Sequence, residues 1–420
     1  MLYIICIILL FEYFLERYLN HLNKKLYSYQ LPEELKGIYD EEHYLKSQQY
    51  ERANDKFSLI TSTFSLILML ALLLTGSFAL LEKWSLSKTT DLVWSTLLFF
   101  GVLALASDIL QTPFALYKLF VIEEKFGFNR TTLKTFFLDK IKAYLLGGII
   151  GGSLLALFVL FYQLTGNNFW IYTWIAVSIF TMIMVMFYAS WILPLFNKLT
   201  PLPGGTLRKK IESYCEKVSF KLDNLFVMDG SKRSAKANAF FSGLGAKKKI
   251  VLFDTLIEKH TEEELVAVLA HEVGHYKRKH TRLTLLLSIL QSGLMLFLLS
   301  KFIDSPQLSE AMGGTGKSFV LGLLAFGLLY SPVSMLLSIG MNMLSRKNEY
   351  EADQYAAATY EPEPMQSALK KLSVDNLSNL RPHPLYVFFY YSHPTLLQRL
   401  GALEKIKGLE GRNEYFKVKQ

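Results

Sequence analysis

The chain has 420 residues, of which 51% are hydrophobic and only 19% are charged. A soluble domain usually carries about 25% charged residues, so this composition excludes a disordered or collagen-like chain and argues against an ordinary soluble protein. The formal net charge is +9, and two cysteines are too few for a disulfide framework. The composition therefore favours a protein embedded in a membrane.

Seven stretches are long and apolar enough to cross the hydrocarbon core of a bilayer, which takes about 20 helical residues. In chain order they are Leu2–Leu19, Leu59–Leu81, Leu92–Leu116, Ala143–Leu164, Phe169–Phe196, Leu283–Phe302 and Phe319–Leu344. The first is the least apolar, because Glu12, Glu16 and Arg17 interrupt it. It also lacks a small-residue cleavage site, so we expect an uncleaved anchor and not a signal peptide.

Basic residues alternate between the two sides of these predicted spans. The connections 20–57, 118–142, 198–282 and 345–420 carry 40 of the 45 Lys and Arg residues. The positive-inside rule places such connections in the cytoplasm, so we expect the N-terminus outside and both long polar segments inside. The basic excess then reflects orientation and contact with anionic lipid. No RRM, zinc-finger or helix-turn-helix pattern accompanies it, and we expect no nucleic-acid partner.

Several spans contain polar residues, among them Asp108, Gln291 and Asn342. At membrane depth such groups usually face a bundle interior or a water-filled cavity. Hydrogen bonds between helices would explain any one of them equally well. Together they favour a wet interior.

The predicted cytoplasmic segment 198–282 has the pattern of an α+β domain. Two short strands are predicted, at Leu225–Met228 and Ile250–Phe253. A helix is predicted to start at Thr261, because Thr261 and Glu264 form a T-x-x-E capping box, and to end near residue 280.

That helix carries the sequence HEVGH at residues 271–275. Its histidines, His271 and His275, are four residues apart, so they lie on one helical face and can bind a single metal ion. Zinc suits them because it accepts imidazole nitrogen in tetrahedral geometry, and Glu272 is placed to take a proton from a water molecule. The alternative is an ordinary amphipathic helix with two surface histidines.

A catalytic zinc site usually has three protein ligands, and the third is predicted within residues 345–353, directly after the last span. Glu349 and Asp353 are four residues apart and project from one helical face. Glu349 would bind zinc, and Asp353 would accept a hydrogen bond from the second nitrogen of a ligand imidazole. Glu351 points to another face and is the weaker candidate. A solvated cluster of charges at a helix end remains the alternative.

Several motifs together resemble the CAAX prenyl protease family of integral-membrane zinc endopeptidases. They are HEVGH at 271–275, SRKNEYEAD at 345–353, SHPTLLQRL at 392–400, VIEEKFGFN at 121–129, FNKLTPLPGG at 196–205, GSKRSAKANAF at 230–240 and IVLFDTL at 250–256. The resemblance covers nearly the whole chain. It implies about seven long helices that enclose a large water-filled chamber, with the zinc site on its cytoplasmic side.

The resemblance also implies the metal-binding and catalytic residues. It implies that one zinc ion is bound by His271, His275 and Glu349, and that Glu272 is the catalytic base.

Three further residues would line the site and engage the substrate backbone or the reacting carbonyl: Asn238, His393 and Arg399. The residues alone leave other interpretations open. Asn238 could cap its own loop, and His393 could be a structural histidine. His280 and His383 are expected to have no role in the site.

The expected protein is therefore mostly α-helical and has four consecutive segments. Residues 1–197 would hold five membrane helices, 198–282 the first part of a cytoplasmic zinc peptidase domain, 283–344 the sixth and seventh helices, and 345–420 the rest of that domain. We expect a monomer in the bacterial cytoplasmic membrane or the endoplasmic reticulum membrane, with the active site facing the cytoplasm.

The predicted activity is hydrolysis of peptide bonds by a CAAX prenyl protease-like endopeptidase that acts on a peptide or protein substrate, with or without a prenyl group. Two alternatives stay open. One is a membrane-protein quality-control protease without prenyl dependence. The other is a non-catalytic transporter or scaffold, suggested by the polar residues within the spans, although the intact HEVGH motif and Glu349 argue against it.

Overall fold

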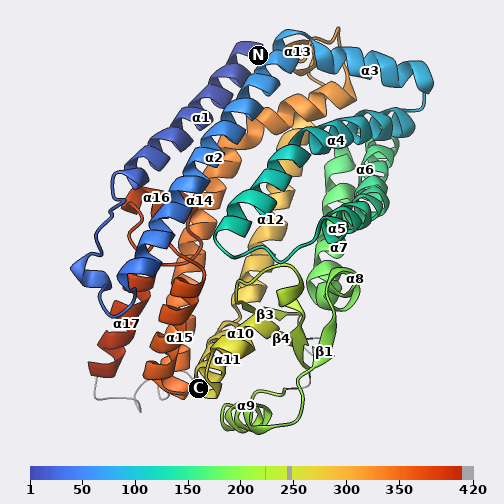
Figure 1. Cartoon of the computed structure of the whole chain (residues 1–420). Coiled ribbons are helices and arrows are strands. Elements are labelled where there is room, and N and C mark those ends of the chain that lie inside the picture. Colours follow the sequence, from blue (N-terminus) through green and yellow to red (C-terminus); the bar gives the residue numbers. More distant parts are fainter. Residues whose placement is uncertain (223, 244–247, 409–420) are drawn as a thin grey trace.

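A computed structural model describes residues 1–222, 224–243 and 248–408. Most of these residues are helical. Long helices make up the end of the molecule that holds the N-terminus, and a small sheet with shorter helices lies at the opposite end (Figure 1).

The first half of the chain consists of helices α1 (Leu2–Lys24), α2 (Glu41–Leu74), α3 (Ser77–Lys88), α4 (Leu92–Tyr117), α5 (Leu133–Leu146), α6 (Gly152–Thr165), α7 (Phe169–Trp191) and α8 (Leu193–Phe196). Short helical turns lie beside them: 3₁₀ turns at Glu33–Leu35 and Gly166–Asn168, and π turns at Lys118–Glu123 and Gly147–Gly151. Side-chain caps explain where three helices begin. Asp40, Asp91 and Thr132 each accept a hydrogen bond from the backbone N–H three residues later, at 2.7, 2.9 and 3.1 Å.

The second half holds β1 (Leu199–Pro201), α9 (Thr206–Lys217), β2 (Leu225–Met228), β3 (Ala239–Ser242), β4 (Lys249–Phe253), α10 (Asp254–Lys259), α11 (Glu262–Lys277), α12 (His280–Phe302), α13 (Pro306–Ala311), α14 (Phe319–Thr359), α15 (Pro362–Asp375), α16 (Pro384–Tyr390) and α17 (Leu396–Gly408), with a 3₁₀ turn at Gly230–Lys232. Both predicted strands and the predicted helix start are confirmed. The helix ends at Lys277, before the predicted residue 280, because Lys279 adopts a left-handed conformation (φ 61°) and a new helix starts at His280.

Five helical segments of the described chain are long and apolar enough to cross a membrane: Glu41–Leu74, Leu92–Glu123, Leu133–Phe196, His280–Phe302 and Phe319–Thr359. Their length and composition agree with the predicted multi-pass membrane protein. The segment Leu133–Phe196 contains two of the predicted spans, and the first predicted span forms α1, which is not among the five. Seven crossings thus stay a prediction.

One predicted span boundary is wrong. The span expected to end at Leu81 is interrupted, since α2 ends at Leu74 and α3 begins at Ser77. Gly76 between them has φ 65°, a left-handed conformation that favours glycine and ends the helix.

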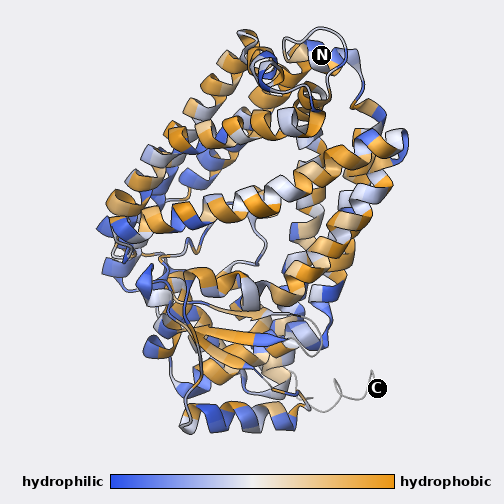
Figure 2. Cartoon of the chain, turned by 90° about the vertical axis from the view of Figure 1, so that its right-hand side faces the viewer, coloured by the Kyte–Doolittle hydropathy of each residue, from blue (hydrophilic) through white to orange (hydrophobic). Residues whose placement is uncertain are grey.

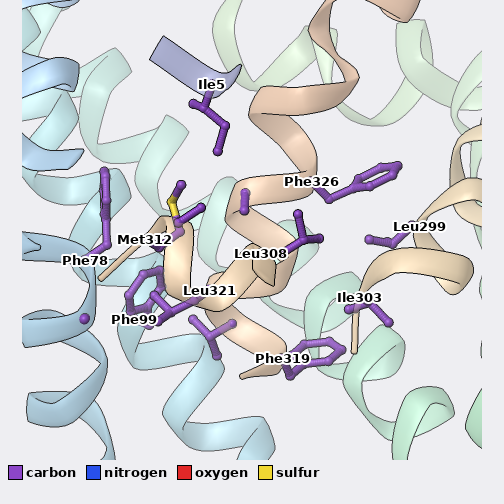
Figure 3. Packing of buried hydrophobic residues seen from close by; sticks show 14 of the residues in the cluster. Ile5, Phe78, Phe99, Leu299, Ile303, Leu308, Met312, Phe319, Leu321 and Phe326 are labelled. Atoms are coloured by element: carbon purple, nitrogen blue, oxygen red, sulfur yellow. The ribbon is translucent and has the colours of Figure 1, made fainter. Parts of the chain in front are cut away.

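The main hydrophobic cluster of the membrane helices lies far from the sheet. Figure 3 shows how side chains from several helices meet there, including Ile5, Phe99, Ile303 and Leu321, each at most 1% exposed. Residue 322 must be glycine for this packing, because a Cβ at Gly322 would lie 2.4 Å from the carbonyl oxygen of Ile303. This cluster fixes the ends of α12 and α14 relative to each other.

The four-stranded sheet has the order β1-β2-β4-β3. Strands β2 and β4 are parallel, whereas β1–β2 and β3–β4 are antiparallel. The strand β3 is therefore an edge of this sheet. A second hydrophobic cluster joins the sheet to α9, α11 and α14, with Ile211, Leu252, Leu269 and Ala356 at most 1% exposed.

Helix α14 connects the two regions, because its 41 residues run from the membrane cluster to the second cluster beside α11 (Figure 1). Figure 2 shows the corresponding change in surface character. Hydrophobic residues cover much of the long helices, and hydrophilic residues gather around the short helices near the sheet. The end of α14 thus brings a long apolar helix into the region of the sheet.

Candidate metal centre and its cavity

Two features fix the position of the HEVGH segment in α11. The predicted capping box is present, since Thr261 Oγ1 accepts from Glu264 N at 3.3 Å and Glu264 accepts from Thr261 N at 2.9 Å. In the middle of the segment, a Cβ at Gly274 would lie 3.1 Å from the backbone of Ala352. Glycine therefore allows α14 to approach α11 closely between the two histidines.

The close approach of α11 and α14 gathers three side chains that could hold a metal ion: His271, His275 and Glu349. The two Nε2 atoms are 3.1 Å apart. The carboxylate oxygens of Glu349 lie 3.5 Å from His271 Nε2 and 3.3 Å from His275 Nε2. Glu349 is only 6% exposed, so its negative charge is enclosed by these partners.

These three side chains fit a zinc ion. Ligand atoms bound at about 2.0–2.1 Å to one tetrahedral ion lie roughly 3.3–3.4 Å from each other, close to the separations of 3.1, 3.3 and 3.5 Å. Two imidazoles and one carboxylate are also a donor set that zinc uses in peptidases. The residues predicted as ligands therefore lie where they could share one ion.

Behind this group, Asp353 and Arg399 form a buried ion pair. Arg399 donates from Nε at 2.8 Å and from Nη2 at 2.6 Å to the two oxygens of Asp353, which is 1% exposed. Asp353 also lies 2.9 Å from His271 Nδ1. Burial would lower the pKa of His271, but the hydrogen bond and charge of Asp353 outweigh burial and raise that pKa. Asp353 thus holds the His271 ring with Nε2 facing the other ligands.

Glu272 lies on the same helix but faces the cavity, where part of its side chain remains open. Its surroundings are otherwise enclosed, and burial raises the pKa of its carboxyl group above the ordinary value. A carboxyl group in this position can accept and release a proton beside the candidate metal centre.

The three other residues predicted for the site also line the cavity: Asn238, His393 and Arg399. His393 Nε2 lies 3.3 Å and Arg399 Nη1 3.4 Å from Glu349. The Asn238 side chain accepts a hydrogen bond from its neighbour's backbone N–H at 2.8 Å, which agrees with the alternative of a loop cap and leaves its amide group exposed.

The cavity has a volume of about 680 Å³. It is lined by the edge strand β3 with its preceding Asn238, and by α7 and α12 through Thr181, Thr284 and Ser288. The edge strand β3 therefore shares one cavity with Glu272 and the three candidate ligands.

Known proteins match this chain along nearly its full length. A family model described as CAAX prenyl protease N-terminal, five membrane helices, matches residues 22–198, and one described as Peptidase family M48 matches residues 201–407. A probable CAAX prenyl protease 1 from Schizosaccharomyces pombe is 38% identical over 382 residues, covering 87% of this chain and 80% of that protein. A CAAX prenyl protease 1 homolog from Homo sapiens is 33% identical over 445 residues, covering 94% and 93%. The chain belongs to the CAAX prenyl protease family.

A solved structure agrees with this assignment. The crystal structure of S. mikatae Ste24p superimposes with a TM-score of 0.91 at 34% sequence identity, and the match covers 96% of this chain and 99% of that one. The chain is thus a membrane metalloendopeptidase of the CAAX prenyl protease type, which acts on a peptide or protein substrate in a membrane environment.

One residue that lines the cavity of this CAAX protease was not found from the sequence, and its partner was considered only as a weaker metal ligand. His280, expected to have no role, lies with Nδ1 3.0 Å from His275 Nδ1, and Glu351 lies 3.1 Å from His280 Nε2. The spacing of five residues from His275 gave no signal, because it does not place both rings on one helical face. The contact depends on the turn at Lys279, which no local pattern predicts.

Proposed function

We propose that this chain is a zinc-dependent endopeptidase that cleaves prenylated proteins near their C-terminus. The observation that carries the proposal is the meeting of His271, His275 and Glu349 at one point beside Glu272, at the wall of a cavity that can take a peptide. The names of the relatives, CAAX prenyl protease 1 and its homologs, supply the proposed substrate class.

One Zn²⁺ per chain would be held by His271, His275 and Glu349. The ion would supply Lewis acidity, which polarises a carbonyl group and lowers the pKa of a water molecule towards about 7. Asp353 supports the site through its hydrogen bond to His271, since such outer partners orient the ligand ring.

Glu272 would act as the general base and then the general acid. Its carboxylate takes a proton from the water that attacks the scissile carbonyl and later gives it to the leaving amine. Glu272 is suited to this exchange because its side chain opens into the same cavity as the candidate ligands.

Arg399 and His393 would stabilise the negative charge that develops on the carbonyl oxygen. Arg399 binds Asp353 through Nε and Nη2, so the remaining nitrogen, Nη1, faces Glu349 and the cavity. His393 approaches Glu349 from the cavity side with 61% of its side chain exposed, which leaves it accessible to substrate.

Substrate would bind as an extended strand beside β3, because an exposed sheet edge offers unpaired backbone groups. The strand β3 forms the edge of the sheet, and the cavity is lined by Ala239, Phe240 and Phe241 of β3. Asn238, directly before this strand, would hydrogen-bond to the substrate backbone.

The proposal includes about seven membrane crossings around a water-filled chamber. Two observations support it: Leu133–Phe196 is long enough to contain two crossings, and in the apolar 18-residue window of each candidate span at most 28% of the residues are buried. Many span residues therefore face lipid or an interior space.

The proposed domain organisation has four segments: 1–197, 198–282, 283–344 and 345–420. Residues 409–420 of the last segment lie outside the described residues.

We also propose a monomer with its active site facing the cytoplasm, on the basis of the basic connections. Of the two membranes predicted, the endoplasmic reticulum is favoured because the relatives named above come from eukaryotes.

The test compares Glu272→Gln with the wild-type protein, both purified in detergent. Glutamine keeps the shape of the side chain but cannot act as a base, so we expect a loss of about 10²–10⁴-fold in kcat with the zinc content unchanged. Normal activity of the variant would contradict the role of Glu272.

Matched farnesylated and unmodified CAAX peptides test the substrate class, and equal kcat/KM on both would favour a general quality-control protease. Zinc binding without cleavage of either peptide would favour a scaffold.

A further inference from the structure

His280 is outside the proposed ligand set, yet its ring packs directly against a proposed ligand. The ring centroids of His275 and His280 are 5.0 Å apart, with an interplanar angle of 76°. Their Nδ1 atoms are 3.0 Å apart. On its other side, His280 Nε2 lies 3.1 Å from Glu351 Oε2. His280 is 6% exposed, so these two contacts account for both ring nitrogens.

The backbone between the two histidines takes an unusual conformation to make this contact. Helix α11 ends at Lys277, and Lys279 has φ 61°, a left-handed conformation that is uncommon for a residue with a side chain. This turn starts α12 at His280 and returns the His280 ring to His275. Strained backbone of this kind is often found at functional sites.

If His275 is a metal ligand, the contacts determine the positions of the ring hydrogens. His275 Nε2 faces Glu349 at 3.3 Å and His271 Nε2 at 3.1 Å, so Nε2 is the nitrogen that would bind a metal ion and must carry no hydrogen. The hydrogen of His275 is then on Nδ1, which donates to His280 Nδ1. His280 accepts at Nδ1, so its own hydrogen is on Nε2, which donates to Glu351. Each ring hydrogen has an acceptor.

We propose that His280 is a positioning residue for the metal centre, which fixes the ring orientation and tautomer of His275 and is itself fixed by Glu351. The proposal rests on the role of His275 as a ligand in the proposed function. It gives the two ligand histidines different supports. His271 donates to the buried carboxylate of Asp353, whereas His275 donates to a second imidazole that ends on the partly exposed Glu351.

The main experiment measures zinc affinity by competition with a chelator of known affinity. In His280→Phe the ring remains but the acceptor for His275 is lost, so we expect zinc affinity to fall about 10- to 100-fold. In His280→Asn an amide oxygen can occupy the place of Nδ1, and we expect most of the affinity to return. Such rescue separates hydrogen bonding from a packing role.

Two further variants complete the comparison. His260→Phe is a matched control, because His260 is also buried, at 7% exposed, and its Nδ1 faces a backbone oxygen of α10. We expect its zinc affinity to equal that of the wild type. Glu351→Ala removes the second acceptor at a site with 34% side-chain exposure, so folding is little affected. We expect a smaller loss of affinity, about 3-fold, because His280 remains.

Two results would overturn the proposal: wild-type zinc affinity in both His280→Phe and Glu351→Ala, or no recovery in a folded His280→Asn. If His280→Phe fails to fold, Glu351→Ala decides the question alone. A wild-type protein that binds no zinc would instead overturn the proposed metal centre.

Discussion

Helix α14 passes through two contrasting regions. From residue 327 to residue 347 it has no buried residue, whereas the last twelve residues include Glu349, Ala352, Asp353 and Ala356, all buried against neighbouring elements. The partner helix α11 is buried along most of its length. Loose packing suits a helix that faces lipid or an interior space, but a metal centre needs ligands held within a fraction of an ångström. The contrast predicts that identical substitutions have different effects in the two regions.

The largest effect on stability is expected at the ion pair of Asp353 and Arg399. In Asp353→Ala the guanidinium stays buried without its partner, so the free energy of unfolding should fall by about 3–5 kcal/mol. The exposed pair of Glu33 and Lys36 is the control, since Glu33→Gln should change stability by about 0–1 kcal/mol. Unfolding of the metal-free proteins in detergent measures both. Equal small changes would mean that the site is not held by this pair.

Two glycine substitutions compare the close contact between α11 and α14 with the exposed part of α14. Gly274→Ala places a methyl group 3.1 Å from the backbone of Ala352, which forces α11 and α14 apart, and we expect a loss of about 1–3 kcal/mol together with weaker zinc binding. Gly340→Ala, in the exposed part of α14, meets nothing within 4 Å and should be neutral or stabilising by about 1 kcal/mol. If both variants behave alike, the proposed difference in packing is wrong.

A smaller effect is expected at the start of α11. Thr261→Ala removes the hydrogen bond to Glu264 N, and the loss of a cap of this type is about 1 kcal/mol. Because the proposed ligand histidines lie more than two turns further on, zinc affinity should stay at the wild-type value. A tenfold weaker zinc affinity in this variant would show that the helix end controls the metal centre.

The smallest expected effect is the contribution of Glu264 to the pH dependence of folding stability. Burial acts to raise the pKa of Glu264, but hydrogen bonds from Lys371 and Ser367 outweigh burial and hold that pKa below 4.5. The resulting stability is fully present above the unfolded-state pKa and is lost as the pH falls through the folded-state pKa. The stability difference between wild type and Glu264→Gln should therefore be constant near pH 7 and shrink below about pH 4.5. A difference that does not shrink on acidification would contradict this assignment.

Local patterns were sufficient for the elements that carry the site. The capping box at Thr261 predicted the start of α11, and the four-residue spacings of His271–His275 and Glu349–Asp353 predicted which side chains share a helical face. These features depend on neighbours within one helix, so the sequence contains them directly.

The remaining features depend on contacts between distant segments. The contact of His280 with His275 requires the left-handed turn at Lys279, and the ion pair of α14 with α17 joins Asp353 and Arg399, which are 46 residues apart in the sequence. Apolar runs also failed to mark the break at Gly76, because hydrophobicity continues across it. Neither periodicity nor composition reports such tertiary geometry.

The continuity of α14 has a consequence for where the enzyme can cut. A helix rises about 1.5 Å per residue, so the path along α14 from Phe319 through Pro332 to Glu349 is roughly 45 Å long, whereas the hydrocarbon core is only about 30 Å thick. The helix is therefore long enough to cross the core and to extend beyond it as far as Glu349. For a substrate that carries its own lipid anchor, the number of residues between that anchor and the scissile bond would then decide which bond can reach the site.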